Sequence, residues 1–274
     1  MDFLLPYLPF VLGLLVIGAL SGVIAGLFGV GGGIITVPAI AFTLQALGYD
    51  GDVVMHAAVG TSLATIIAVG SVSARAHNAR GAVDWVLVRQ WGPFLVASAL
   101  LGGVMARLYS GDALRIIFGV MALFIALNIV LPVQRRMMER LKDVPAANRV
   151  SAVLIGYISS LMGIGGGSLS VPTMVAFGFP IHTAVGTGSA LGVVLAIPGA
   201  LGFVISGWGA AGLPPLSLGF VNIAAMLLVG GLASLTAPLG AALAHKMAQR
   251  PLKLAFAAFL SVVGIRMIVQ AVLG

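Results

Sequence analysis

The chain has 274 residues, of which 60% are hydrophobic and only 8% are charged, and its formal net charge is +7. A soluble domain of this size cannot cover its surface with so little charge, so lipid must surround most of the protein. The absence of cysteine excludes disulfides and thiolate metal sites. The basic residues gather in a few short loops, as topology signals do, and no soluble face is left to bind nucleic acid.

Ten apolar segments follow one another along the chain. A membrane-spanning helix needs about 20 apolar residues. No basic region precedes the first segment, so we interpret it as a permanent span and not as a signal peptide. We expect spans near residues 4–28, 34–48, 57–74, 90–109, 113–131, 150–163, 168–180, 183–206, 217–244 and 252–273.

Eleven basic residues lie in three loops that share one side of the membrane if there are ten spans. Cytoplasmic loops are enriched in Lys and Arg, so this side is predicted to be cytoplasmic and both termini extracytoplasmic. We therefore expect a multi-pass protein of the cell membrane, with the lipid bilayer as its surroundings. The eleven residues are Arg75, Arg80, Arg89, Arg135, Arg136, Arg140, Lys142, Arg149, Lys246, Arg250 and Lys253.

A sequence repeat divides the chain into two similar parts. Gly29–Pro38, with the letters GVGGGIITVP, recurs 134 residues later as Gly163–Pro172, with the letters GIGGGSLSVP. His56–Ser62 likewise matches His182–Gly188. The repeat predicts a first membrane repeat over residues 1–131, a cytoplasmic linker over 132–149 and a second membrane repeat over 150–274. Five spans in each repeat would place the second repeat upside down relative to the first.

We therefore predict an all-α integral membrane protein of about ten transmembrane helices, in two inverted five-helix repeats with glycine-interrupted helices. This is a common plan of transporters, whose binding site lies at the repeat interface near the middle of the membrane. Other small residues recur every fourth position. One row is Gly18, Gly22 and Gly26, and another is Ser98, Gly102 and Ala106. Such rows let helices approach closely.

The glycine runs are the candidate binding elements. A helix is expected to begin after each run, at about Ile34 and Ser168, with N–H groups that have no intrahelical partner. The helix dipole and these N–H groups attract anions, and glycine lets a ligand approach the backbone. A hinge or packing break is the alternative interpretation. The candidate substrate-binding residues are Gly31, Gly32, Gly33, Thr61, Ser62, Gly165, Gly166, Gly167, Ser168, Thr187 and Ser189.

Three further residues are candidates for gating or for carrying a proton. His56 and His182 occupy matching places in the two repeats, and each could titrate near neutral pH or cap a helix at the interface. Arg266 lies inside the last expected span, where it could hold an anion, pair with a carbonyl or reach the outer surface. Asp84 and Asn222 also match, and we expect both to cap helices.

The positions of the acidic residues bear on the charge of the substrate. No Asp or Glu lies well inside an expected span, which disfavours a cation as substrate and a carboxylate proton relay. An intramembrane enzyme is the rival class, with Ser189 as its candidate nucleophile. The residues around Ser189 do not form a convincing nucleophile element, so we expect no catalytic residue, no cofactor and no metal.

The repeated motifs resemble those of the TauE/SafE sulfite exporter family. The resemblance rests on Gly29–Gly33 with Val37 and Pro38, on His56–Leu63 and on Arg80–Asp84, and it continues in the second copy. It implies a permease of the cell membrane, commonly an exporter, that moves small sulfur-containing anions such as sulfite, thiosulfate or organosulfonates.

The second copy departs from the first at one position. Gly188 stands where the first copy has Ser62, and a hydroxyl follows at Ser189, so the two half-sites need not be equivalent. A channel or uniporter for small anions is the alternative within transport.

Overall fold

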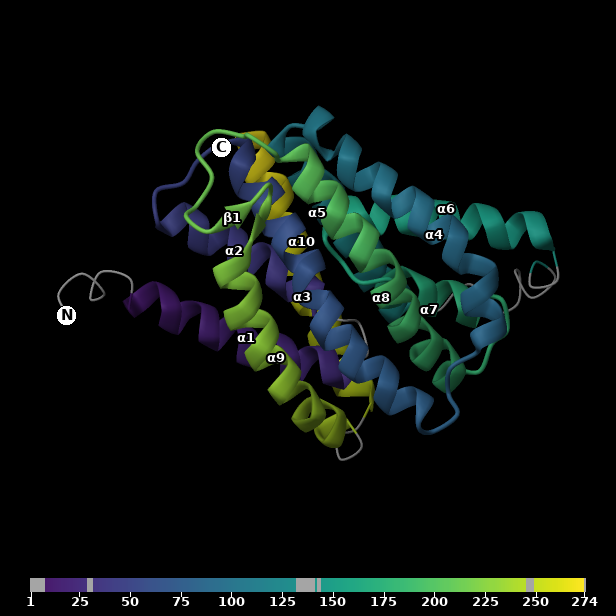
Figure 1. Ribbon diagram of the computed structural model, residues 1–274. Coiled ribbons are helices and arrows are strands. Elements are labelled where there is room, and N and C mark those ends of the chain that lie inside the picture. Colours follow the sequence, from purple (N-terminus) through teal and green to yellow (C-terminus); the bar gives the residue numbers. More distant parts are fainter. Residues whose placement is uncertain (1–7, 29–31, 132–140, 142–143, 245–248, 274) are drawn as a thin grey trace.

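The computed structural model describes residues 8–28, 32–131, 141, 144–244 and 249–273 (Figure 1). These residues form ten α-helices, a short 3₁₀-helix and a two-stranded hairpin. The helices are α1 (Leu8–Phe28), α2 (Gly33–Ala46), α3 (Asp52–Asn78), α4 (Trp85–Met105), α5 (Gly111–Val130), α6 (Pro145–Met162), α7 (Gly167–Ala176), α8 (Ile181–Ser206), α9 (Ile223–Ala244) and α10 (Gln249–Leu273). The short elements are η2 (Ala106–Leu108), β1 (Ser217–Leu218) and β2 (Val221–Asn222).

The number of helices agrees with the expected ten segments, but their lengths differ. Six helices within the described residues are long and apolar enough to cross a membrane, namely α3, α4, α5, α8, α9 and α10. Helices α2 and α7 have 14 and 10 residues, so they are about 21 and 15 Å long. Neither can cross a hydrocarbon core of about 30 Å on its own.

Two expected boundaries were wrong. The span expected over 217–244 begins only at Ile223, because Ser217 and Leu218 pair with Asn222 and Val221 in an antiparallel hairpin. The expected linker over 132–149 ends early, because Pro145 starts α6. Proline is favoured in the first turn of a helix, where its missing N–H has no intrahelical acceptor to lose.

Polar side chains set several helix starts. The carboxylate of Asp84 accepts hydrogen bonds from the N–H groups of Val86 and Leu87, each at 3.0 Å. Asn222 Oδ1 accepts one from the N–H of Ala225 at 2.9 Å. The prediction that Asp84 and Asn222 cap helices is therefore confirmed.

Helices α3 and α8 form the centre of the molecule and run antiparallel. The most apolar 18-residue stretches of α3 and α8 are 83% and 67% buried, against 28% in α10. Their contacts pair early residues of one helix with late residues of the other. A Cβ on Gly60 would lie 3.0 Å from Phe203 Cβ, a Cβ on Gly70 would lie 2.9 Å from Val193 Cγ2, and Ser73 Oγ lies 3.2 Å from Ser189 Oγ.

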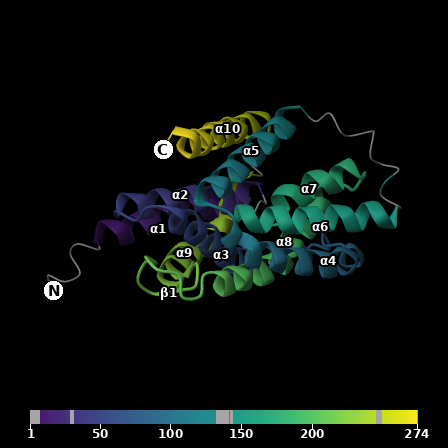
Figure 2. The same ribbon diagram turned by 90° about the horizontal axis from the view of Figure 1, so that it is seen from above.

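The remaining helices pack around this centre with the two sequence repeats interlocked (Figures 1 and 2). Helix α1 packs on α9, and its counterpart α6 packs on α4. Helix α3 packs on α9, and its counterpart α8 packs on α4. Helix α5 pairs with its own counterpart α10 along one side of the bundle (Figure 2). Each of these contacts thus has its equivalent when the repeats are exchanged.

Glycines allow the close helix crossings. A Cβ on Gly18 would lie 2.9 Å from the carbonyl oxygen of Val229 in α9, and one on Gly102 would lie 3.1 Å from that of Tyr157 in α6. These two contacts confirm the packing role predicted for the two rows of small residues. At the α4–α8 crossing, a Cβ on Gly103 would lie 2.5 Å from the carbonyl oxygen of Gly199.

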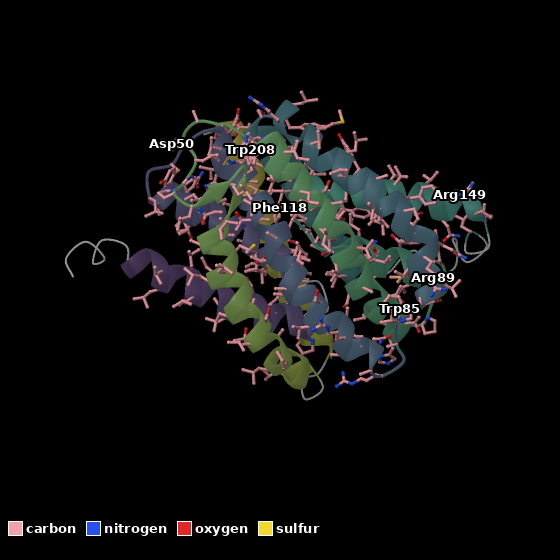
Figure 3. All side chains as sticks on the ribbon, viewed as in Figure 1. Asp50, Trp85, Arg89, Phe118, Arg149 and Trp208 are labelled. Carbon is pink, nitrogen blue, oxygen red and sulfur yellow. The ribbon has the colours of Figure 1, made fainter. Side chains whose placement is uncertain are left out.

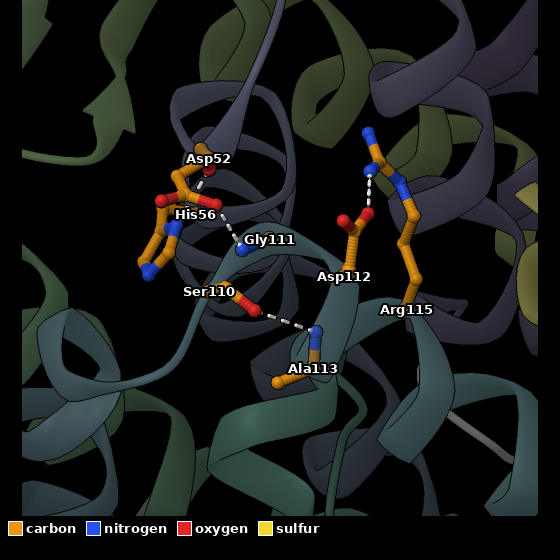
Figure 4. A network of polar contacts seen from close by, with 7 residues as sticks. All are labelled: Asp52, His56, Ser110, Gly111, Asp112, Ala113 and Arg115. Atoms are coloured by element: carbon orange, nitrogen blue, oxygen red, sulfur yellow. Dashed lines mark hydrogen bonds and ion pairs between the residues drawn. The ribbon is translucent and has the colours of Figure 1, made fainter. Parts of the chain in front are cut away.

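A polar cluster ties the start of α3 to the end of α4 and the start of α5 (Figure 4). The ring nitrogens of His56 lie 2.6 Å from the carbonyl oxygen of Asp52 and 2.8 Å from that of Ala106. The His56 ring is buried, and its centroid lies 4.7 Å from that of Phe220. The carboxylate of Asp52 accepts a hydrogen bond from the N–H of Gly111. His56 therefore acts as a structural tie between two helix ends.

Replacing Gly103 by valine tests the α4–α8 crossing. The added side chain would overlap the backbone of α8, and we expect it to lower the free energy of unfolding by about 1–3 kcal/mol. Gly13→Val is the control, because a Cβ at Gly13 meets no heavy atom within 4 Å. Thermal unfolding in detergent measures both. Equal midpoints for the two variants would contradict this packing.

The role of His56 is tested by comparing His56→Ala with His182→Ala. The first removes a buried ring together with its hydrogen bond to the carbonyl oxygen of Ala106, and the lost packing and hydrogen bond cost about 1–3 kcal/mol. The second removes an exposed side chain, and such changes stay within about 0.5 kcal/mol. We expect only His56→Ala to lower the thermal midpoint. A larger loss in His182→Ala would show that the tie assigned to His56 is wrong.

Candidate anion site

The two glycine runs meet at the centre of the molecule. A Cβ on Gly33 would lie 3.0 Å from the Cα of Ile164, and one on Gly163 would lie 2.9 Å from the Cα of Val59. Ser62 Oγ donates a hydrogen bond of 2.7 Å to the carbonyl oxygen of Gly163. The Ser62 hydroxyl of the first repeat is thus hydrogen-bonded to the glycine run of the second repeat. Candidate residue Gly31 lies outside the described residues.

Backbone conformation explains why glycine stands at the ends of these helices. Gly163 ends α6 with φ 66°, and Gly32 precedes α2 with φ 75°. Both values lie in the left-handed region, which glycine adopts at no steric cost. A glycine run therefore separates α1 from α2, and another separates α6 from α7. The backbones of the two runs remain in contact with each other.

A small cavity lies where the second run meets α3 and α8. Its volume is about 10 Å³, close to the lower limit for holding one water molecule. Glycine and serine make up most of its walls. They are lined by Ile66, Gly70 and Ser73 of α3, by Gly165 and Gly167 of the run and the start of α7, and by Gly188, Ser189 and Gly192 of α8.

The start of α7 presents unpaired backbone donors to this region. The N–H groups of Gly166 and Gly167 have no hydrogen-bond acceptor in the described part of the chain. A Cβ on Gly192 would lie 3.4 Å from the nitrogen of Gly166 and 4.0 Å from that of Gly167. Because residue 192 is glycine, no side chain at this position of α8 stands against the two nitrogens. The positive end of the α7 dipole lies at the same place.

Three serine hydroxyls flank the second run without partners. Ser159 lies in the last turn of α6, and Ser168 and Ser170 lie in the first turn of α7. All three are buried, with exposures of 0%, 3% and 0%. Among the described residues, these are the buried side chains whose oxygen atoms have no hydrogen-bond partner. Of the three, only Ser168 was predicted as a site residue.

The candidate threonines hold helix starts of the opposite repeat. Thr61 Oγ1 accepts a hydrogen bond of 2.9 Å from the N–H of Asn222 at the start of α9. Thr187 Oγ1 accepts one of 2.9 Å from the N–H of Asp84 at the start of α4. These two bonds are equivalent under exchange of the repeats, and they place both threonines in structural contacts.

Ser189 lines the cavity but lacks the surroundings of a nucleophile. Its hydroxyl donates to the carbonyl oxygen of Val185 at 3.0 Å and hydrogen-bonds to the hydroxyl of Ser73 at 3.2 Å. The first contact is the back-bonding typical of serine in a helix. No histidine is among these partners, so the geometry offers no base to activate Ser189.

The gating candidates lie away from the cavity lining. His56 ties helix ends, as described above. His182 is exposed at the start of α8, close enough to His77 for their charges to interact. The guanidinium of Arg266 lies 4.9 Å from the centroid of the Phe42 ring, which is a cation–π contact between α10 and α2.

The start of α2 differs from that of α7. It borders an apolar pocket lined by Gly32, Ile34 and Ile35 of the run and α2, by Ile24 and Ala25 of α1, and by Phe256 of α10. Thr36 is the buried hydroxyl nearest the start of α2, and it donates to Ser21 Oγ at 3.2 Å or to the carbonyl oxygen of Gly32 at 3.1 Å. The starts of α2 and α7 therefore differ in the side chains around them, and also in backbone, since Gly32 has φ 75° and its equivalent Gly166 has φ −51°.

Sequence reasoning missed several cavity residues. Ile66, Gly70, Ser73, Gly188 and Gly192 belong to none of the predicted substrate-binding positions, although they line the cavity. Gly188 and Gly192 are four residues apart in α8, so their spacing placed them on one face of the helix. For Ser73, no motif or spacing in the sequence marks the contact with α8.

Comparison with known proteins identifies the family of this chain. The family described as "Sulfite exporter TauE/SafE" matches residues 14–267. A "Probable membrane transporter protein" of Haemophilus influenzae is 34% identical over 261 residues, which cover 95% of this chain and 99% of that protein. One of Bacillus subtilis is 27% identical over 282 residues, covering 94% and 97%. No solved structure matches the chain. The chain therefore belongs to the TauE/SafE sulfite exporter family, whose members are membrane transporters.

Proposed function

We propose that this transporter moves small sulfur-containing anions, such as sulfite, thiosulfate or organosulfonates, out of the cell by alternating access. The observation that carries the proposal is the small cavity at the start of α7, where the N–H groups of Gly166 and Gly167 have no hydrogen-bond acceptor in the described part of the chain. Such a helix start binds anions without a lysine or arginine. The TauE/SafE family is described by its export of sulfite, and an oxyanion of that kind suits neutral hydrogen-bond donors.

The two membrane repeats, residues 1–131 and 150–274, are proposed to be inverted. Helices α3 and α8 are equivalents in the sequence repeat, and they run antiparallel. Helix α2 leads into the start of α3, whereas α7 leads into the start of α8, which lies beside the end of α3. Helices α2 and α7 therefore leave the meeting point of the glycine runs toward opposite ends of the bundle. Inverted repeats with interrupted helices are typical of transporters.

The cytoplasmic face is proposed to be the end that carries the basic residues. Arg89 and Arg149 lie together at one end of the molecule, and Asp50 and Trp208 lie at the other (Figure 3). Because Lys and Arg are enriched on the cytoplasmic side, the Asp50 end would be extracytoplasmic. Helix α10 ends toward that side in Figure 1, as expected for an extracytoplasmic C-terminus, and inversion would place the N-terminus there too.

The size of the cavity supports alternating access. A volume of about 10 Å³ holds no sulfur oxyanion, so α3 and α8 must separate before substrate enters. The Ser73–Ser189 hydrogen bond of 3.2 Å joins the two helices beside the cavity, and it would break in that step. The closed packing around this cavity favours alternating access over an open channel.

Flux in proteoliposomes tests the proposal, with Gly192→Ala as the informative variant. The added methyl would lie 3.4 Å from the nitrogen of Gly166, a distance that the fold tolerates but that covers the donor. We expect the initial rate of labelled sulfite flux to fall at least about tenfold, the loss of one hydrogen bond to a charge. Thermal stability should not fall, because alanine is favoured over glycine in a helix.

Gly230→Ala is the matched control for this experiment. Its added Cβ would also make only an ordinary contact, 3.5 Å from Thr65, in a helix outside the cavity lining. We expect flux in this variant to equal that of the natural chain. Wild-type-like flux in Gly192→Ala would refute the helix-start site, and transport of other solutes without any sulfur anion would refute the proposed substrate.

A further inference from the structure

The three unpartnered hydroxyls around the second glycine run need an explanation. A buried hydroxyl without a hydrogen bond costs about 1–3 kcal/mol in proteins. Ser159, Ser168 and Ser170 all carry this cost within the two helical turns that the run joins. Most buried polar groups in native proteins have partners, and a ligand that supplies such partners would explain three unpartnered hydroxyls together.

The first repeat carries no unpartnered hydroxyl at the equivalent positions among the described residues. With the spacing of 134 residues, Ser159 corresponds to Ala25, Ser168 to Ile34 and Ser170 to Thr36. Ala25 and Ile34 line the apolar pocket at the start of α2, and the hydroxyl of Thr36 has partners. The equivalent positions thus carry apolar or hydrogen-bonded side chains in the first repeat and hydroxyls without partners in the second.

We propose that Ser159, Ser168 and Ser170, with the N–H groups of Gly166 and Gly167, form an anion subsite that selects singly charged over doubly charged anions. This inference rests on the proposed function, and all five of its residues belong to the second repeat. The site has five neutral donors, one from each of these residues. A singly charged anion with an SO₃ group offers three oxygen atoms. Each of them can accept hydrogen bonds from more than one donor.

The preference for singly charged anions follows from the lack of charged residues over most of the second repeat. Residues 150–245 contain no Lys, Arg, Asp or Glu, so no fixed charge of this segment balances the ligand. The cost of transferring an ion from water to a medium of low dielectric constant rises with the square of its charge. Neutral donors that offset this cost for one charge fall short for two. A doubly charged anion of the same shape is therefore held more weakly.

Methanesulfonate and thiosulfate form a matched pair of probes for this idea. Both carry an SO₃ group on one further heavy atom, but the first has a single negative charge and the second has two. We expect methanesulfonate to bind the purified protein and to move through proteoliposomes at least about tenfold better than thiosulfate. Both measurements use the full chain at one pH and one ionic strength.

Serine-to-alanine variants test which hydroxyls make the subsite. We expect Ser159→Ala and Ser168→Ala each to weaken methanesulfonate binding about tenfold. Their thermal midpoints without ligand should stay unchanged or rise, because each variant removes an unsatisfied buried group. A purely structural serine would give the opposite pattern. Ser234→Ala is the control, since its hydroxyl is already bonded to the carbonyl oxygen of Gly230 at 2.7 Å.

The outcomes separate this inference from the proposed function. Equal transport of the two probes, or unchanged methanesulfonate binding in both serine variants, would overturn the subsite while sulfur-anion transport stands. Absence of binding and flux for sulfite and for both probes would overturn the proposed function and this inference with it. Preference for methanesulfonate that is lost in Ser159→Ala and Ser168→Ala would establish the subsite.

Discussion

The contact between the backbones at Gly33 and Gly163 is the constraint on which the rest of the structure depends. Irregular backbone cannot face lipid, because its N–H and C=O groups would find no partner there. The two breaks are therefore placed against each other in the protein interior, where Ser62 donates to the carbonyl oxygen of Gly163. Any side chain at these positions would push the two breaks apart.

The central helices follow from this arrangement. To enclose both breaks, α3 and α8 pack closely through small residues such as Gly60, Gly70 and Gly199. The starts of α4 and α9 are then fixed by hydrogen bonds from the N–H groups of Asp84 and Asn222 to Thr187 and Thr61. The same polar side chains that interrupt a hydrophobic sequence thus serve to join one repeat to the other.

Local signals in the sequence were enough for much of the fold. Hydropathy located the helices, and the capping roles of Asp84 and Asn222 followed from residue type and position. The hairpin at Ser217–Asn222 was missed because apolar residues hide it within a longer hydrophobic stretch. The limited lengths of α2 and α7 were also expected, since the apolar segments near 34–48 and 168–180 are short and each follows a glycine run.

The candidate site was less accessible to sequence reasoning, because its walls come from distant segments. The glycine runs could be recognised in the sequence because they are repeated. The contact between Ser73 and Ser189 could not, because 116 residues of chain separate the two serines. The partner of Thr61 is 161 residues away, so its structural role could not be separated from a role in binding. The hydroxyls of Ser159 and Ser170 have no hydrogen-bond partner among the described residues. This depends on the side chains around them and could not be predicted from their residue type.

A reversible lock between α3 and α8 tests the central claim most directly. The natural chain has no cysteine, so Ser73→Cys combined with Ser189→Cys introduces one pair of thiols at positions whose hydroxyl oxygens lie 3.2 Å apart. Flux of labelled sulfite is measured in proteoliposomes before oxidation, after oxidation and after reduction. The account predicts that oxidation stops flux in the double variant, that reduction restores it, and that neither single variant responds. Undiminished flux through the disulfide-bonded protein would contradict it.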